Sequence, residues 1–212
     1  MTLSYLLYAP VSLTILFLTL AVSIVALLKE DVRDRLILIP YDMLIYKEYW
    51  RLLTAGFIHG NYLHLTFNLT TFYFFAFMLE HRIGHWQFGV LYLAGMLISH
   101  LATTVAFRND SSFEGSLGAS GGISALVLAA AFANPYLKFG LPIISTTWPA
   151  LQLPGYLIGI AYLLYSLVNV FRKSELRLNH QAHLWGAVSG ILLIFLLKPN
   201  TWMVINRYVE AL

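Results

Sequence analysis

The sequence predicts an all-α integral membrane protein, a bundle of six transmembrane helices that forms one domain over residues 1–212. Composition is the first reason: 59% of the residues are hydrophobic, 11% are charged, and the mean hydropathy is +0.72. A soluble domain carries about 25% charged residues. The second reason is that the apolar residues gather in six stretches. These approach the ~20 residues that a helix needs to cross a hydrocarbon core of about 30 Å.

Charges, prolines and polar turns separate the six stretches. In chain order the stretches are predicted at residues 11–28, 62–79, 86–106, 119–133, 153–171 and 180–197. The fourth has about 15 residues and is only about 22 Å long as a helix, so it either begins below the membrane surface or does not cross. The connection over residues 29–60 is interrupted by charges and by Pro40 but contains apolar segments such as "LILIP". It is therefore predicted to be a long, partly embedded first loop.

Composition also excludes several classes of function. The net charge of +3 is small and scattered, which argues against nucleic-acid binding. The absence of cysteine excludes disulfides, thiolate catalysis and cysteine-ligated metals. The first apolar stretch lacks both a basic region before it and a small-residue cleavage site after it, so we expect a retained helix and not a removed signal peptide.

Polar residues stand at the beginnings of the second, fourth and sixth stretches. In a six-span topology these three helices run in the same direction, so their N-terminal ends lie on one side of the membrane. The residues concerned are His59, His64, Asn68, Ser120, His180 and His183. Because a polar group inside a membrane is costly unless it is paired, this convergence predicts a functional site.

Ser120 and His183 are the candidate nucleophile and general base of that site. Each lies near a pair of glycines spaced four residues apart: Gly118 and Gly122 flank Ser120, and Gly186 and Gly190 follow His183. Such spacing lets two helices approach closely, so packing through these glycines would place the hydroxyl beside the imidazole. Each residue taken alone has a plainer interpretation. A serine in a membrane helix more often bonds its own backbone, and a buried histidine is more often structural.

His64 and Asn68 are candidate donors to an oxyanion. They lie four residues apart and share one face of the second helix. Together with the main chain between Gly118 and Ser120, at an exposed helix start, they offer N–H groups to the negative oxygen that forms during acyl transfer. An equally weighted alternative is that both side chains bond other helices. Because the fourth and sixth stretches contain no Asp or Glu, the chemistry would be that of a Ser-His dyad.

Five short motifs then resemble those of the rhomboid family of intramembrane serine proteases. They are "GASG" around Ser120, "AHLWG" over residues 182–186, "HLTFN" over 64–68, "YWR" over 49–51 and "EHRIG" over 80–84. Their order and separations match the family over roughly residues 48–190. The resemblance implies that Ser120 is the nucleophile, that His183 is the base, and that His64 and Asn68 bind the oxyanion. The supporting residues would be Gly121, Gly186, Ser124 and His59, and the structural residues would be Trp50, Arg51, Glu80 and Arg82.

The resemblance further implies a rhomboid-like six-helix bundle that cleaves transmembrane protein substrates among membrane lipids, without cofactor or metal. It implies that the fifth helix, with Pro154 and Gly155 near one end, acts as the gate. We expect a prokaryotic cytoplasmic membrane with both termini in the cytoplasm. The positive-inside rule favours the opposite orientation, since nine of the 13 Lys and Arg fall in the odd-numbered loops. We follow the family, because the charges of the first loop are expected to pair locally.

One position departs from the family pattern. Well-described bacterial members carry an aromatic residue four positions after the nucleophile, stacked on the catalytic imidazole, whereas this chain has Ser124. We expect its hydroxyl to bond the His183 ring or a water.

Two other functions are compatible with parts of the sequence. The first is a catalytically inactive rhomboid-like protein that binds or escorts membrane helices, although such proteins usually lack the serine or the histidine. The second is a metal transporter or metalloprotease in which His180 and His183 share a metal ion with His64. No His-Glu-x-x-His motif and no carboxylate in a membrane span completes such a site.

Overall fold

The computed structural model describes residues 6–134, 138–139, 153–171 and 179–210. Six helices form its bundle: α2 (Pro10–Leu28), α6 (Tyr62–Ile83), α7 (His85–Phe107), α8 (Ser120–Ala133), α10 (Gly155–Phe171) and α11 (His180–Leu197). Each agrees with a predicted stretch to within four residues. By length and composition α2, α7 and α11 are able to cross a membrane, and α8 and α10 are shorter apolar helices. The fold class is thus confirmed, whereas six crossings stay a prediction.

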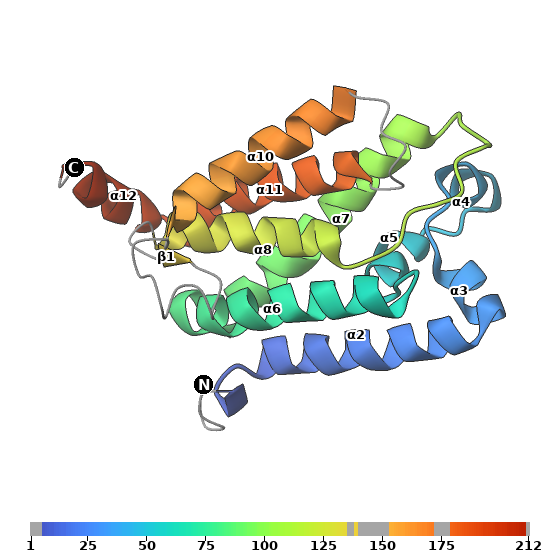
Figure 1. The fold of residues 1–212 in the computed structure, drawn as a ribbon, viewed down its shortest axis with the longest axis horizontal. Coiled ribbons are helices and arrows are strands. Elements are labelled where there is room, and N and C mark those ends of the chain that lie inside the picture. Colours follow the sequence, from blue (N-terminus) through green and yellow to red (C-terminus); the bar gives the residue numbers. More distant parts are fainter. Residues whose placement is uncertain (1–5, 135–137, 140–152, 172–178, 211–212) are drawn as a thin grey trace.

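Helix α8 lies at the centre of the bundle. Helices α6, α7, α10 and α11 all pack against it, and α2 lies outside, against α6 and α7. Figure 1 shows that α6, α8 and α11 begin at the same end of the molecule. The short helices that follow α2 lie at that end, and α12 (Thr201–Glu210) lies at the other. The predicted common direction of these three helices is therefore confirmed.

The first loop is folded into four short helices around one arginine. They are α3 (Glu30–Leu36), α4 (Pro40–Tyr46), α5 (Arg51–Thr54) and the 3₁₀ helix η1 (Ala55–Phe57). The Nε of Arg51 pairs with Glu48 at 2.6 Å, and its Nη1 donates to the carbonyls of Asp34 and Ile37 at 2.7 Å. Arg51 is nearly buried, whereas its neighbour Trp50 is half-exposed. The loop is held together from within by these bonds.

The expected local pairing of first-loop charges is confirmed for Arg33 and Arg51. Besides the Arg51 pair, Arg33 contacts Glu30 at 3.7 Å and Asp34 at 3.2 Å. The positive-inside count also included Arg172, Lys173 and Arg177, which lie outside the described residues.

Glu80 and Arg82 secure the ends of two other helices. Glu80 is fully buried and accepts the N–H groups of Val11 and Ser12, at 3.1 and 2.6 Å, in the first turn of α2. A helix start offers such N–H groups without an intrahelical acceptor, and a carboxylate there is also favoured by the helix dipole. Arg82 acts at a helix C-terminus instead: its Nε donates to the carbonyl of Ala133, the last residue of α8, at 2.7 Å. Glu80 and Arg82 therefore tie α6 to the start of α2 and to the end of α8.

Glycines of α11 bring its backbone against that of α8. A Cβ atom at Gly186 would overlap the carbonyl of Gly121, and one at Gly190 would overlap that of Ala125. The prediction of a close seam is confirmed for α11, but the face of α8 was wrong. Gly122 faces Tyr92 and Met96 of α7 instead. Gly118 precedes the helix, so the helical period begins only at Ser120.

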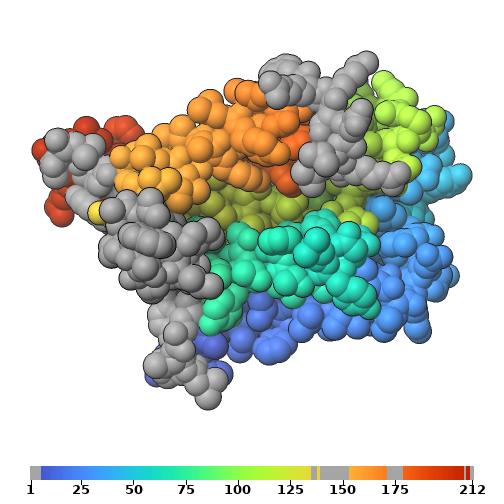
Figure 2. All heavy atoms as spheres, in the orientation of Figure 1, coloured from blue at the N-terminus to red at the C-terminus, as the bar shows by residue number. Residues whose placement is uncertain are grey.

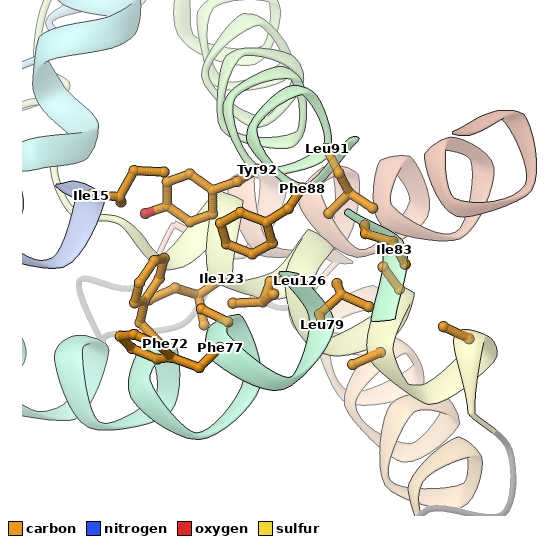
Figure 3. Packing of buried hydrophobic residues seen from close by; sticks show 14 of the residues in the cluster. Ile15, Phe72, Phe77, Leu79, Ile83, Phe88, Leu91, Tyr92, Ile123 and Leu126 are labelled. Carbon is orange, nitrogen blue, oxygen red and sulfur yellow. The ribbon is translucent and has the colours of Figure 1, made fainter. Parts of the chain in front are cut away.

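A hydrophobic core fills the space between α6, α7 and α8 (Figure 3). The rings of Phe72 and Tyr92 meet edge to face with centroids 5.2 Å apart, and those of Phe72 and Phe88 lie 6.3 Å apart. Ile15 of α2, Ile123 and Leu126 of α8 complete the cluster from either side. Large side chains pack α8 on this side and the backbone of α11 packs it on the other, so α8 has little freedom to move.

The sequence did not predict two small elements. One is α12, a helix of ten residues that directly follows the polar "KPN" turn. The other is a short antiparallel pair of strands, β1 (Lys138–Phe139) with β2 (Leu153–Pro154), immediately before α10. Pro154 and Gly155, expected at the gate, thus lie where β2 gives way to α10.

Candidate active site

The Ser120 hydroxyl and the His183 imidazole meet where α8 and α11 begin. Ser120 is the first residue of α8, and His183 lies in the first turn of α11. Ser120 Oγ and His183 Nε2 are 2.8 Å apart, although 63 positions separate the two residues in the chain. With the ring proton on Nδ1, the hydroxyl donates to Nε2. This is the contact through which a histidine removes a proton from a serine nucleophile.

Gly118 forms the turn that leads into Ser120. Its φ of +116° lies in a region that side chains rarely adopt, and a Cβ there would lie 2.8–2.9 Å from the imidazole of His64. Glycine is therefore required both for the backbone conformation and for the approach of His64. The Gly118 N–H donates to the carbonyl of Ala55 at 2.8 Å. It is thus not available in this conformation as the oxyanion donor expected from the sequence.

The main-chain donors at this site lie two and three residues after Gly118. The first hydrogen bond within α8 runs from the Ile123 N–H to the Ala119 carbonyl, at 2.9 Å. The N–H groups of Ser120 and Gly121 precede that bond and belong to the positions for which a helix offers no acceptor of its own. They point a partial positive charge toward the end of α8 at which Ser120 stands.

His59 supports the residue before the nucleophile. Ser23 donates its hydroxyl to the carbonyl of Phe57 at 2.8 Å, so the Ser23 oxygen accepts from His59 Nδ1–H, also at 2.8 Å. His59 Nε2 is then unprotonated and accepts the Ala119 N–H at 3.4 Å. The His59 ring is fully buried. Burial, and secondarily the neighbouring His64, lower the pKa of His59 to about 3, which keeps this neutral tautomer.

His64 and Asn68 lie on one face of α6, as their spacing predicts. The His64 ring packs against Gly118 and meets the His59 ring edge to face, with centroids 4.8 Å apart. Asn68 is nearly buried, and its Nδ2 donates to the His64 carbonyl at 2.9 Å. This bond uses one of two amide hydrogens, so the second remains for another acceptor.

Asn179 joins three elements at the same end of the bundle and was not predicted. Its Oδ1 accepts the Ala182 N–H at 3.2 Å and caps α11. Its Nδ2 donates to Thr103 of α7 at 2.7 Å and to Ser116 at 2.9 Å. Ser116 in turn pairs with Leu38 of the first loop through two main-chain bonds. An asparagine just before a helix is a common cap, and that signal was present in "NHQA".

The Ser124 hydroxyl does not bond the His183 ring, which was one of the two expected partners. Its hydroxyl donates to the Ser120 carbonyl at 2.7 Å and lies 2.6 Å from the hydroxyl of Tyr162, on α10. The Tyr162 ring stacks on His183 with centroids 6.3 Å apart and planes 27° apart. An aromatic ring from α10 thus stacks on the imidazole, although the position four residues after Ser120 is a serine.

The remaining histidine of the convergence, His180, packs edge to face on His183 with centroids 6.2 Å apart. Within the described parts of the chain, no three His, Asp or Glu side chains come together in a way suited to a metal ion. The metal-binding alternative therefore has no geometric support there.

Comparisons with known proteins agree on one family. The family model described as the Rhomboid domain matches residues 46–200. Rhomboid-like protein 11, chloroplastic, of Arabidopsis thaliana is 28% identical over 71% of this chain and 53% of its own length. The putative rhomboid protease YdcA of Bacillus subtilis (strain 168) is 29% identical over 70% of this chain and 67% of its own length. The rhomboid protease GlpG of Serratia proteamaculans (strain 568) is 27% identical over 88% of this chain and 62% of its own length. The chain thus spans between about half and two thirds of these relatives.

Proposed function

The chain belongs to the rhomboid family of multi-pass integral membrane proteins, and we propose that it is an intramembrane serine endopeptidase that cleaves transmembrane-helix substrates. One observation carries the proposal: Ser120 Oγ lies 2.8 Å from His183 Nε2 across two helices. Two of its relatives bear the name of rhomboid proteases. No cofactor or metal enters the mechanism that follows.

Acylation begins with proton transfer. His183 Nε2 takes the Ser120 hydroxyl proton while Oγ attacks the carbonyl carbon of the scissile peptide, so that a C–O bond forms and the carbonyl oxygen becomes an oxyanion. The protonated imidazole then gives its proton to the leaving amine, and the C–N bond breaks. A water molecule reverses these steps on the acyl-enzyme, returning the proton to Ser120 and releasing the carboxylate product.

The oxyanion is stabilised by donors from the start of α8 and from α6, which packs against α8. The N–H groups at the start of α8 supply main-chain donors, and His64 and the free amide hydrogen of Asn68 supply side-chain donors. Each such donor is worth about 2.7–4 kcal/mol of transition-state stabilisation where water is excluded. The role of Gly118 is to admit the His64 ring, since its own N–H is bonded to Ala55.

Substrate reaches Ser120 from the lipid, between α6 and α10. Both helices pack on α8 but make almost no contact with each other within the described residues. On the face drawn in Figure 2, a strip of α8 is visible between them. Ser120 and Val127, seven residues apart on α8, are partly exposed, whereas the residues between them are buried. Lateral access requires α10 to act as the gate.

The substrate helix must unwind near the cut, because the carbonyls of an intact helix are hydrogen-bonded and shielded. Small or helix-breaking residues beside the scissile bond should therefore favour cleavage. Equal cleavage of a peptide series in which these residues are replaced by leucine contradicts this expectation.

The proposed location is a prokaryotic cytoplasmic membrane, with both termini in the cytoplasm. Two of the relatives above are bacterial, and two of the first-loop charges that oppose this orientation, Arg33 and Arg51, pair locally. A C-terminal fusion to a reporter that is active only in the cytoplasm tests the orientation. An inactive reporter on a folded fusion places the C-terminus outside.

Labelling with a fluorophosphonate probe tests the catalytic proposal. We expect the purified wild type in detergent to be labelled, Ser120→Ala not at all, and His183→Ala about 10²- to 10⁴-fold more slowly. Ser111→Ala, which changes an exposed serine of the polar turn, is the control and should label like wild type. Labelling of Ser120→Ala overturns the assignment of the nucleophile. A folded wild type that neither labels nor cuts a transmembrane peptide favours the helix-escorting alternative.

A further inference from the structure

Tyr162 of α10 contacts His183 directly and is linked to Ser120 through Ser124. Its ring stacks on the imidazole of His183, with centroids 6.3 Å apart and planes 27° apart. Its hydroxyl lies 2.6 Å from Ser124 Oγ, which is itself bonded to the main chain of Ser120. Tyr162 therefore joins α10 to α11 through its ring and to α8 through its hydroxyl.

The direction of the hydroxyl bond follows from proton counting. A serine hydroxyl has one hydrogen, and the Ser120 carbonyl can only accept. Ser124 donates to that carbonyl at 2.7 Å, so the hydrogen in the 2.6 Å contact comes from Tyr162. The chain Tyr162 O–H, Ser124 O–H, Ser120 carbonyl is thus fully directed, and it fixes the rotation of the Tyr162 ring over His183.

His183 needs such a constraint. Its ring donates no bond to a carboxylate of its own helix or of α8, because neither segment contains Asp or Glu. An imidazole must face Ser120 with Nε2 in order to act as a base, and a stacked aromatic ring restricts its rotation. Ser124 is 2% exposed beneath the Tyr162 hydroxyl, so a large side chain at position 124 would compete with Tyr162 for the same space.

We propose that Tyr162 is the positioning residue that orients His183 toward Ser120, and that Ser124 fixes Tyr162 through its hydroxyl. The aromatic partner of the imidazole is thereby supplied by α10 and not by α8. This inference rests on the proposed protease function. Tyr162 acts through His183 and touches no reacting atom.

Tyr165 provides a matched control on the same helix. It lies three residues after Tyr162, is half-exposed, and packs edge to face on His180 with centroids 5.8 Å apart. Changes at Tyr165 therefore test the effect of altering an α10 tyrosine without altering the ring that stacks on His183.

The experiment measures fluorophosphonate labelling rates, kcat and KM on a transmembrane peptide, and melting temperature. We expect Tyr162→Leu to lower the labelling rate and kcat together by about three- to tenfold, with KM and melting temperature nearly unchanged. Tyr162→Phe retains the ring and should recover most of that loss. Tyr165→Leu should behave as wild type.

A double-variant cycle tests the hydroxyl chain. Ser124→Ala removes the acceptor of the Tyr162 hydroxyl, so adding Tyr162→Phe should slow labelling no further. Additive losses, or a folded Tyr162→Leu with wild-type labelling and kcat, overturn the inference. If Tyr162→Leu does not fold, the cycle with Tyr162→Phe still decides. Failure of the protease proposal is distinct, because the wild type itself then remains unlabelled.

Discussion

Helices α11 and α10 both pack on α8 near Ser120, but they do so by different means. The α11 contact is made by backbone on backbone, with Gly186 against the Gly121 carbonyl and Gly190 against that of Ala125. The α10 contact is made by side chains. Gly159 faces the flexible end of Leu128, and Tyr162 bonds Ser124. The base therefore stands on a helix that has little freedom relative to the nucleophile, and the ring that orients it stands on a helix with more.

This difference suits a protease that must admit a substrate helix from the side. A catalytic pair has to keep its geometry within fractions of an ångström, which close backbone packing provides. A gate has to move, which a contact of side-chain ends and hydroxyls allows. Breaking the backbone contact of α11 with α8 should therefore cost more than disturbing the side-chain contact of α10 with α8.

The largest effect is expected from Gly186→Ala. The added methyl group would overlap the Gly121 carbonyl, so the two helices must separate, at a cost of about 3 kcal/mol in the free energy of unfolding. Separation also lengthens the contact between Ser120 and His183, so probe labelling should fall. The matched control is Gly159→Ala on α10, whose Cβ would lie 3.0 Å from a Leu128 methyl that can turn aside. Equal losses of melting temperature in the two variants contradict the proposed difference.

The buried His59, which bonds Ser23 and the Ala119 N–H beside Ser120, should make the stability of the fold sensitive to acid. An unfolded histidine gains a proton below about pH 6.5, whereas the buried His59, with its pKa lowered to about 3, stays neutral. The unfolded state thus binds more protons, and the free energy of unfolding falls by about 2 kcal/mol between pH 7.5 and pH 5.0. The stability that His59 provides is complete above pH 6.5 and is lost progressively toward pH 3.

Melting temperatures at pH 7.5 and pH 5.0 test this prediction. His59→Gln should melt lower than wild type at pH 7.5, because the bonds to Ser23 and Ala119 are disturbed. It should lose less between the two pH values than wild type does. Parallel decreases in both proteins show that His59 is not the group responsible.

The sequence predicted the helices well because charges and prolines delimit apolar stretches in this chain. It also predicted that Ser120 would meet His183, from the spacing of Gly118 with Gly122 and of Gly186 with Gly190. The partner face on α8 was wrong because Gly118 has a φ of +116° and lies before the helix, so counting in steps of four from Gly118 begins two residues too early. A residue pattern gives the period of a helix but not its first residue.

Contacts made across the bundle were beyond prediction from one sequence. Helix α10 contains three tyrosines, and nothing in "GYLIGIAYLLYSLVNVF" distinguishes Tyr162 from the other two. Its importance arises only when α10 packs beside α8 and α11. The bond from Ser23 to His59 likewise joins α2 to the segment before α6 over 36 positions. Such pairs depend on tertiary packing, which local periodicity does not encode.

The smallest effect is expected from a reversible disulfide that ties α10 to α8. This lock tests whether α10 must move during cleavage. A Cβ at Gly159 would lie 3.6 Å from Ala131 Cβ, within the range that a disulfide bridges, and the chain has no cysteine of its own to interfere. Oxidised Gly159→Cys/Ala131→Cys should cleave a transmembrane peptide about tenfold more slowly, and a reductant should restore the rate. Labelling by the small probe should not change, because the lock holds Tyr162 over His183.

Each single cysteine variant is the control. If oxidation leaves peptide cleavage unchanged, α10 does not move to admit the substrate. If it lowers labelling and cleavage equally, the lock has distorted the dyad, and the contrast between a rigid α11 and a mobile α10 is not supported.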